Sequence, residues 1–171
     1  MKSITLLLLS LPLLAAAQAE VPAQPAAGPC DAPEYRQFDF WLGSWDVSAH
    51  GRIVGHNDVA RIQDGCTVTE DYRAVDGPYA GRSFNWWDPV ASRWHQVWVD
   101  SGGTRLQLTG GLQDGSMVLA GERVRDGKLI SDRITWTPNP DGTVRQHWEV
   151  SEDGGLSWGT LFDGLYTRSE P

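Results

Sequence analysis

Closely spaced turn signals restrict the fold of this 171-residue chain more than any other feature. After Val47, Gly-containing and Pro-containing clusters recur at short intervals and leave runs of about five to ten residues, the length of single strands. They lie at Gly51, Gly55, Asp64-Gly65, Asp76-Gly77-Pro78, Asp88-Pro89, Ser101-Gly102-Gly103, Asp114-Gly115, Asp126-Gly127, Pro138–Gly142 and Asp153-Gly154-Gly155. Asp-Gly is typical of tight hairpins, because both central residues of the favoured turn need a positive φ. The sequence therefore predicts consecutive antiparallel hairpins.

The same spacing favours closure of the sheet. No run between the turns is long and periodic enough for a crossover helix, so parallel pairing is not expected. An open meander of this length would expose two strand edges, and closing it removes them. We predict an all-β, antiparallel up-and-down barrel of roughly eight to ten strands.

An aromatic stretch precedes the first expected strand. Phe38, Trp41, Leu42 and Trp45 follow one another at helical spacing, and the pattern changes to alternation from Gly43. We expect a short helical turn that leads into the barrel, with Trp45 filling one end, because a large aromatic side chain can close a small barrel. A core Trp in a β-sandwich would give the same local pattern.

This stretch, Gly43-Ser44-Trp45, resembles the Gly-x-Trp opening of lipocalins and other calycins. In those proteins an Arg or Lys at the end of the last strand packs over the Trp, and Arg168 is the matching position. Roughly residues 35 to 168 are also similar to a bacterial family of uncharacterised, secreted, lipocalin-like proteins. The shared positions are Phe40–Trp45, Gly65-Cys66 with Glu70, Ser83 with Asn85, Trp94 to Trp98, and Arg145-Gln146. The resemblance implies a calycin-like barrel in which Arg168 contacts Trp45, and it implies no particular ligand.

The N-terminal region has the features of an export signal. Lys2, the apolar run 4–14 and Ala17-Gln18-Ala19 predict a signal peptide over residues 1–19, and nothing later predicts a membrane anchor. Residues 20–30 form a Pro/Ala-rich linker, and residues 31–171 are long enough for a single β-barrel domain. We expect a secreted protein of the bacterial periplasm. In that oxidising compartment Cys30 and Cys66, the only two cysteines, are expected to form a disulfide.

Charge argues against several partners. The chain has 14 basic and 22 acidic residues and a formal net charge of −8, and signal removal would take away Lys2 alone among them. Nucleic acids and anionic lipid surfaces are therefore not expected to bind.

Polar residues interrupt the apolar face of several runs. Glu70, Gln96, Asp132 and Gln146 all fall in step with apolar neighbours and are expected to point inward. Buried polar groups must satisfy one another or face a wet cavity, so either a closed structural network or a ligand site would account for them. The candidate ligand-binding residues are Glu70, Asn85, Gln96, Trp98, Asp132, Gln146 and Trp148. The register near Ser83 and Asn85 is ambiguous: if both point inward, Phe84 and Trp86 must face outward.

The opposite parity is expected to be the solvated outer face. It contains Thr67, Thr69, Asp71, Arg93, His95, Arg145, His147 and Glu149. His95 and His147 lack a third ligand, so no metal site and no cofactor are expected. The segment Ser151–Trp158 resembles the Asp-box turn of sialidases and other propellers, in which the Asp has a structural role.

Conventional catalytic motifs are missing from the sequence. The leading expectation is a secreted calycin-like barrel that binds a small apolar or amphipathic molecule, with Glu70, Gln96 and Gln146 as orienting polar groups. One alternative is a hydrolase that uses Glu70 and Asp132 as a carboxylate pair. Another is an interaction module with a filled interior and an exposed aromatic surface.

Overall fold

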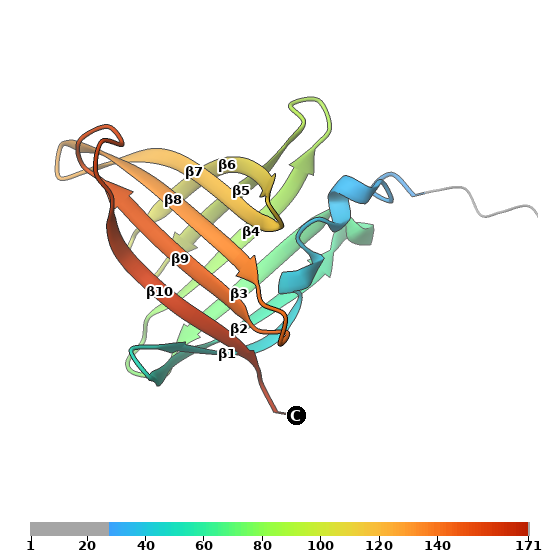
Figure 1. The fold of residues 1–171 in the computed structure, drawn as a ribbon, viewed down its shortest axis with the longest axis horizontal. Helices are drawn as coiled ribbons and strands as arrows, with labels where there is room; N and C mark the ends of the chain where they lie inside the picture. Colours follow the sequence, from blue (N-terminus) through green and yellow to red (C-terminus); the bar gives the residue numbers. More distant parts are fainter. Residues whose placement is uncertain (1–27, 171) are drawn as a thin grey trace, which may run out of the picture.

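The computed structural model describes residues 28–170 and shows a closed antiparallel barrel (Figure 1). Its ten strands are β1 (Gly43–Ala49), β2 (Arg52–Ile62), β3 (Thr67–Ala74), β4 (Ala80–Asp88), β5 (Arg93–Asp100), β6 (Arg105–Gln113), β7 (Ser116–Arg125), β8 (Lys128–Pro138), β9 (Val144–Ser151) and β10 (Gly159–Arg168). Each strand pairs with its neighbours in sequence, and β10 returns to pair with β1, where Arg168 lies opposite Trp45. The predicted up-and-down barrel is confirmed.

The turn chemistry explains this meander. In the His50-Gly51, Asp114-Gly115 and Asp126-Gly127 turns both residues have positive φ, as tight hairpins require. Gly55 was expected to mark a turn, and this expectation was wrong, because Gly55 lies inside β2. A side chain there would overlap the ring of Tyr72, so the close approach of Tyr72 accounts for the glycine.

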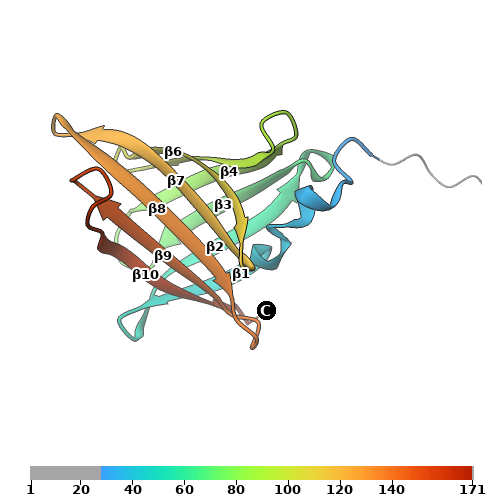
Figure 2. The same cartoon turned by 45° about the horizontal axis from the view of Figure 1, so that its top comes forward.

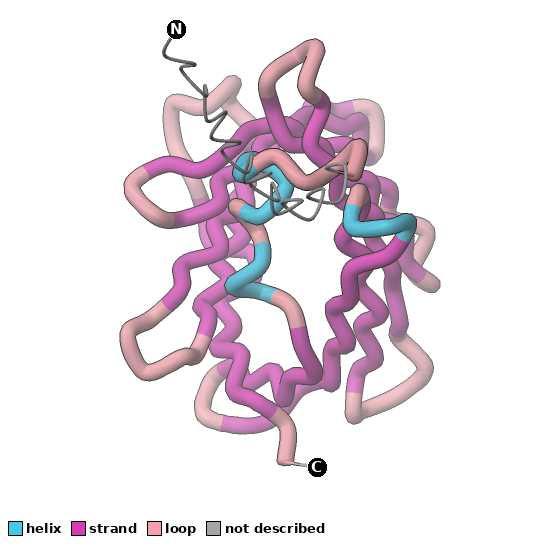
Figure 3. The backbone as a smooth tube through the Cα atoms, turned by 90° about the vertical axis from the view of Figure 1, so that its right-hand side faces the viewer, coloured by secondary structure: helices cyan, strands magenta, loops and turns pink. Residues whose placement is uncertain are grey.

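The N-terminal segment covers one end of the barrel. It contains two 3-10 helices, η1 (Pro33–Arg36) and η2 (Asp39–Trp41), and a third, η3 (Gln63–Gly65), lies between β2 and β3. Figures 1 and 2 place η1 and η2 at the end opposite the β7–β8 and β9–β10 hairpins, and Figure 3 looks along the barrel from the helical end. The predicted helical turn is therefore present, in the tighter 3-10 form.

Aromatic side chains fill this covered end. Phe38, Trp41 and Trp45 are fully buried, and Phe38 stacks on Trp41 with ring centroids 4.8 Å apart. The rings of Trp94 and Trp136 pack against Phe38 at 5.7 and 5.3 Å. The indole of Trp45 donates a 2.8 Å hydrogen bond to the Trp41 carbonyl oxygen. Trp45 thus fills the end together with Phe38 and Trp41.

The contact expected between Arg168 and Trp45 is also present. The guanidinium carbon of Arg168 lies 3.8 Å from the centre of the Trp45 ring, and Nη1 donates a 2.6 Å hydrogen bond to the Leu42 carbonyl oxygen. Gly43 has a φ of +134°, and a Cβ there would overlap the Arg168 guanidinium. A glycine is needed at this position for both reasons.

A disulfide joins Cys30 to Cys66, as the sequence predicted. Cys66 directly precedes β3, so the bond attaches the chain before η1 to the barrel wall. The predicted signal peptide and the linker up to residue 27 lie outside the described residues. Within residues 28–170, no helix has the length and apolar character that a membrane span requires.

Candidate functional site

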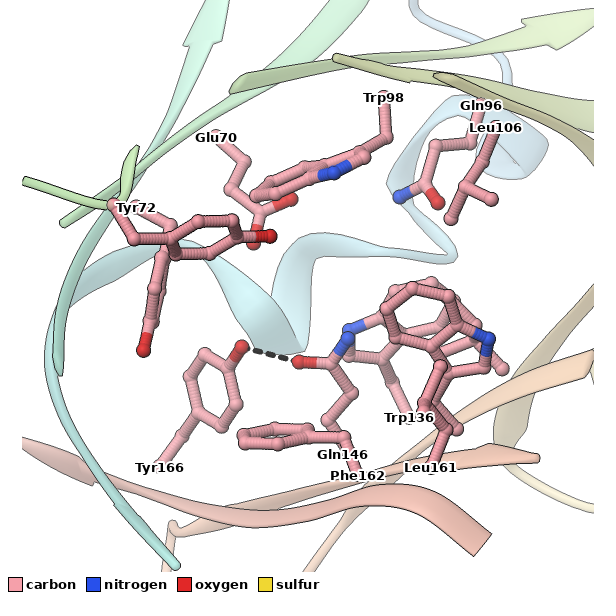
Figure 4. Close-up of a pocket in the computed structure, with 13 residues that line it drawn as sticks. Glu70, Tyr72, Gln96, Trp98, Leu106, Trp136, Gln146, Leu161, Phe162 and Tyr166 are labelled. Atoms are coloured by element: carbon pink, nitrogen blue, oxygen red, sulfur yellow. Dashed lines mark hydrogen bonds between the residues drawn. The ribbon is translucent and has the colours of Figure 1, made fainter. Parts of the chain in front are cut away.

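A cavity of about 250 Å³ lies inside the barrel, toward the end away from η2 (Figure 4). Its mouth is marked by Tyr79 and Leu161, which are 40% and 47% exposed. Aromatic and aliphatic side chains form most of the wall, and three polar side chains interrupt it. The lining residues are Glu70, Tyr72, Tyr79, Gln96, Trp98, Leu106, Ile134, Trp136, Gln146, Trp148, Leu161, Phe162 and Tyr166.

Glu70 on β3 is the centre of a buried hydrogen-bond network. Its side chain is almost fully buried, and its two oxygens each accept a 2.8 Å bond, Oε1 from the Asn57 amide and Oε2 from the Ser83 hydroxyl. The Asn85 amide donates to Ser83 Oγ at 2.9 Å, and the Gln96 amide donates to Asn85 Oδ1 at 2.8 Å. The bonds from Gln96 through Asn85 and Ser83 therefore all run toward the carboxyl group. Such an arrangement stabilises a carboxylate.

Burial acts against that ionisation. Removal from water raises the pKa of Glu70 from 4.5 to about 7, and the bonds from Ser83 and Asn57 limit the rise. Near neutral pH the ionised and neutral forms of Glu70 are therefore present in comparable amounts.

The opposite wall is connected to Glu70 through Tyr166 on β10. The Tyr166 hydroxyl donates to Gln146 Oε1 and accepts a 3.4 Å bond from the Asn57 amide. Figure 4 shows Glu70, Tyr72 and Trp98 on one side of the cavity, and Gln146, Phe162 and Tyr166 on the other. Burial, followed by the nearby Glu70, raises the pKa of Tyr166 well above 10, so its hydroxyl keeps its proton.

Asp100 orients two aromatic side chains at the mouth. Its Oδ2 accepts bonds from the Tyr79 hydroxyl at 2.9 Å and the Trp98 indole at 3.1 Å, while Oδ1 accepts from the backbone N–H of Gly102 and Thr104. Partial burial opposes ionisation, but the bonds from Thr104, Trp98 and Tyr79 outweigh it and lower the pKa of Asp100. The mouth therefore carries a negative charge at neutral pH.

Asp132 on β8 is buried but does not line the cavity. Arg123 binds it through Nε at 2.8 Å and Nη2 at 3.3 Å, and the Trp148 indole donates to its Oδ1 at 2.8 Å. Asp132 is thus paired with a cation and positions Trp148. Glu70 and Asp132 lie on strands that are five places apart in the closed order of ten, on opposite sides of the barrel.

The structure separates the candidate residues into two groups. Glu70, Gln96, Trp98, Gln146 and Trp148 line the cavity. Asn85 and Asp132 are buried but do not line the cavity. Each of them accepts a hydrogen bond from a lining side chain, Asn85 from Gln96 and Asp132 from Trp148.

The register that the sequence left open is also settled. Ser83 and Asn85 point inward and are fully buried, whereas Phe84 faces outward and is 49% exposed. The outward Trp86 stacks on His95 with ring centroids 5.1 Å apart.

Several important residues were not among the candidates, notably Asn57, Tyr79, Phe162 and Tyr166. Phe162, Gly164 and Tyr166 follow one another at a spacing of two along β10, and this spacing could have predicted that they share the inward face. Leu161 joins the lining beside Phe162 because the β9–β10 register shifts between Thr160 and Phe162. Simple alternation cannot predict that irregularity.

The outer face is as expected at most positions. Thr67 is the exception: it is buried, and its hydroxyl donates a 2.6 Å bond to Gln63 Oε1, so the expected exposure was wrong there. His95 and His147 lie on β5 and β9, which are not neighbours, and residues 28–170 contain no cluster of three or more metal-ligating side chains. In the segment that resembles an Asp-box, the Asp153 carboxylate accepts bonds from the Ser157 backbone N–H at 2.9 Å and the Ser151 hydroxyl at 2.7 Å.

Comparison with models of known protein families and with curated protein sequences finds no match to this chain.

Proposed function

We propose that this chain is an exported, calycin-like barrel that binds one small apolar or amphipathic molecule in its interior. The observation that carries the proposal is the cavity itself, in which aromatic walls surround the polar ends of Glu70, Gln96 and Gln146. Mostly apolar walls with a few convergent polar groups are typical of small-molecule sites. The volume of about 250 Å³ lies slightly below the usual range for such sites, so we expect a ligand with a single ring or a short chain.

The other functions considered have less support. A carboxylate-pair hydrolase needs two carboxyl groups that converge on one bond, but Asp132 is occupied by Arg123 and Trp148 outside the cavity wall. An interaction module with a filled interior does not account for the cavity. Export to the periplasm is supported by the signal-like N-terminal sequence and by the disulfide.

Native mass spectrometry of protein purified from the periplasm without denaturation tests the proposal. We expect a co-purifying small molecule, or an empty protein that binds the neutral probe 2-phenylethanol at one site by calorimetry. Ile134→Phe should abolish that binding, because Ile134 is buried in the cavity wall and a larger side chain would fill the space. Val90→Phe is the matched control, since Val90 is 93% exposed in a loop at the covered end. An empty protein that binds neither 2-phenylethanol nor its amine analogue 2-phenylethylamine, or an Ile134→Phe variant that binds as tightly as the wild type, would contradict the proposal.

A further inference from the structure

Glu70 has no positively charged partner in the cavity. It is the only Asp or Glu among the thirteen described lining residues, and none of these is Lys, Arg or His. Asp132, another buried carboxylate of the barrel, differs from Glu70 in this respect, because Arg123 neutralises its charge. A buried carboxylate without a counter-ion is costly, and a cation that binds beside it offsets part of this cost.

The hydrogen bonds around Glu70 leave room for such a cation. Each carboxylate oxygen accepts a single bond within the protein, one from Asn57 and one from Ser83, although it can accept two. Asn57 and Ser83 both donate to the carboxyl oxygens, and this arrangement favours the ionised form. The free lone pairs are therefore suited to a charged N–H donor.

The surrounding aromatic rings are suited to the same charge. Tyr72, Tyr79, Trp98 and Tyr166 line the cavity with Glu70, and Tyr72 and Tyr79 pack edge to face with centroids 6.2 Å apart. Aromatic faces attract ammonium groups, and the attraction is stronger where water is excluded. Asp100 adds a negative charge behind Tyr79 and Trp98 at the mouth. Glu70 and Asp100 would repel an anion, and a neutral hydroxyl group would leave the Glu70 charge uncompensated.

We propose that the ligand is an organic cation, a small protonated amine with an apolar body, whose ammonium group pairs with Glu70 inside the aromatic cavity. This inference rests on the proposed function and specifies the chemical class of its ligand.

Binding of such a ligand should depend on pH through Glu70. The groups that face this carboxyl are Asn57 and Ser83, which do not titrate, and Tyr72, Tyr79 and Tyr166. Burial is the main cause that raises the pKa of each of these tyrosines, so all three remain neutral up to at least pH 8. Among these groups only Glu70 changes charge between pH 5 and 8, because burial raises its pKa to about 7. An amine that remains protonated throughout should therefore bind more tightly at pH 8 than at pH 5.

Three probes of nearly equal size test the charge preference: 2-phenylethylamine, 2-phenylethanol and phenylacetate. Affinities are measured by calorimetry on the full mature protein at pH 8 and pH 5, with the fold checked by circular dichroism. We expect the amine to bind at least tenfold more tightly than the alcohol at pH 8, and phenylacetate to bind most weakly. The advantage of the amine over the alcohol should shrink at least fivefold at pH 5, where Glu70 is neutral.

Two variants separate the role of Glu70 from a general effect of negative charge. Glu70→Gln should remove the preference for the amine and its pH dependence. Asp71→Asn removes the neighbouring carboxylate, which faces outward beside Arg73 and Arg82, and should bind like the wild type. If the alcohol binds as tightly as the amine, or if Glu70→Gln retains the preference, the cation assignment is wrong while the binding function stands. If none of the three probes binds, both proposals fail.

Discussion

Burial and hydrogen bonding shift the pKa of Glu70 in opposite directions. Burial raises the pKa of the carboxyl to about 7, whereas Ser83 and Asn57 donate hydrogen bonds that stabilise the charge. A group poised in this way responds strongly to a new neighbour, because a small electrostatic change decides which form predominates. The same balance should make the free energy of unfolding of the ligand-free protein depend on pH.

Stability of the ligand-free barrel should decrease as the pH rises from 4.5 to about 7. A carboxyl whose pKa is raised on folding binds its proton more tightly in the folded state, so the folded protein holds more protons than the unfolded chain in this window. The difference between 4.5 and about 7 corresponds to about 3 kcal/mol in the free energy of unfolding. Urea unfolding of the wild type and Glu70→Gln at pH 5 and pH 8 measures it, because the Gln variant lacks this titration.

Other carboxyl groups act in a different pH range. Hydrogen bonds lower the pKa values of Asp46, Asp100 and Asp163 below 3.8, so the stability that these groups provide is lost only as the pH falls toward and below that value.

A wild type that matches Glu70→Gln in its pH dependence between 5 and 8 would show that Glu70 is solvated.

The pair of Trp45 and Arg168 offers a second test at the residue scale. Trp45→Ala should lower the free energy of unfolding by about 3–5 kcal/mol, because a fully buried indole is removed. Arg168→Ala should cost less, since Arg168 lies at the surface over the Trp45 ring. The double variant should be less destabilised than the sum of the single changes, by about 0.5–1 kcal/mol. Strict additivity in denaturant unfolding would mean that the stacking contributes nothing.

At the scale of elements, two glycines create the space that the cavity aromatics occupy. Trp98 on β5 lies over Gly81 of β4, and Tyr72 on β3 lies over Gly55 of β2, so that a side chain at either glycine would overlap a ring. Glycine in a strand interior often marks such a close approach. The strands themselves therefore set how far the aromatic rings project into the cavity.

Gly81→Ala should displace Trp98 from the β4 backbone and weaken probe binding severalfold, with a loss of about 1–3 kcal/mol in stability from overpacking. Gly111→Ala is the matched control: Gly111 also lies within a strand, β6, and a methyl group there would meet no other atom within 4 Å. Urea unfolding and calorimetry with 2-phenylethylamine give the two readouts. Equal behaviour of the two variants would show that the Trp98 ring can shift without consequence.

The strands were predictable from sequence because their turns carry a local chemical requirement. Asp114-Gly115 and Asp126-Gly127 both adopt the positive φ values that the hairpins need. The inward direction of Glu70, Gln96, Asp132 and Gln146 followed from alternation with apolar residues. These features depend on residues a few positions apart, so the sequence displays them directly.

Features that depend on cross-strand geometry could not be predicted in the same way. Asn57 donates to Glu70 only because β2 and β3 pair with Val59 opposite Glu70, and Arg123 meets Asp132 only through the register of β7 and β8. The division of inward polar residues into cavity lining and supporting groups therefore required the assembled barrel. Leu161 reaches the lining through a register shift that leaves no pattern in the sequence.

At the scale of the whole molecule, the net charge of −8 gives a field that attracts cations. If the ligand is an amine, its association rate should fall as the salt concentration rises, whereas the rate for 2-phenylethanol should not change. Salt screens charge over about 10 Å at 0.1 M, so the difference should be visible between 10 mM and 300 mM sodium chloride in stopped-flow fluorescence of the cavity tryptophans. Equal salt dependence of the two probes would contradict electrostatic attraction of the ligand.

The aromatic closure formed by Phe38, Trp41 and Trp45 has a consequence for exchange. Because these buried side chains fill one end, a bound ligand must leave, and a second ligand must enter, through the same mouth beside Tyr79 and Leu161. A competing ligand in solution can enter only after the bound ligand has left. Dissociation of the bound ligand should therefore be first order, at a rate that does not depend on the competitor concentration.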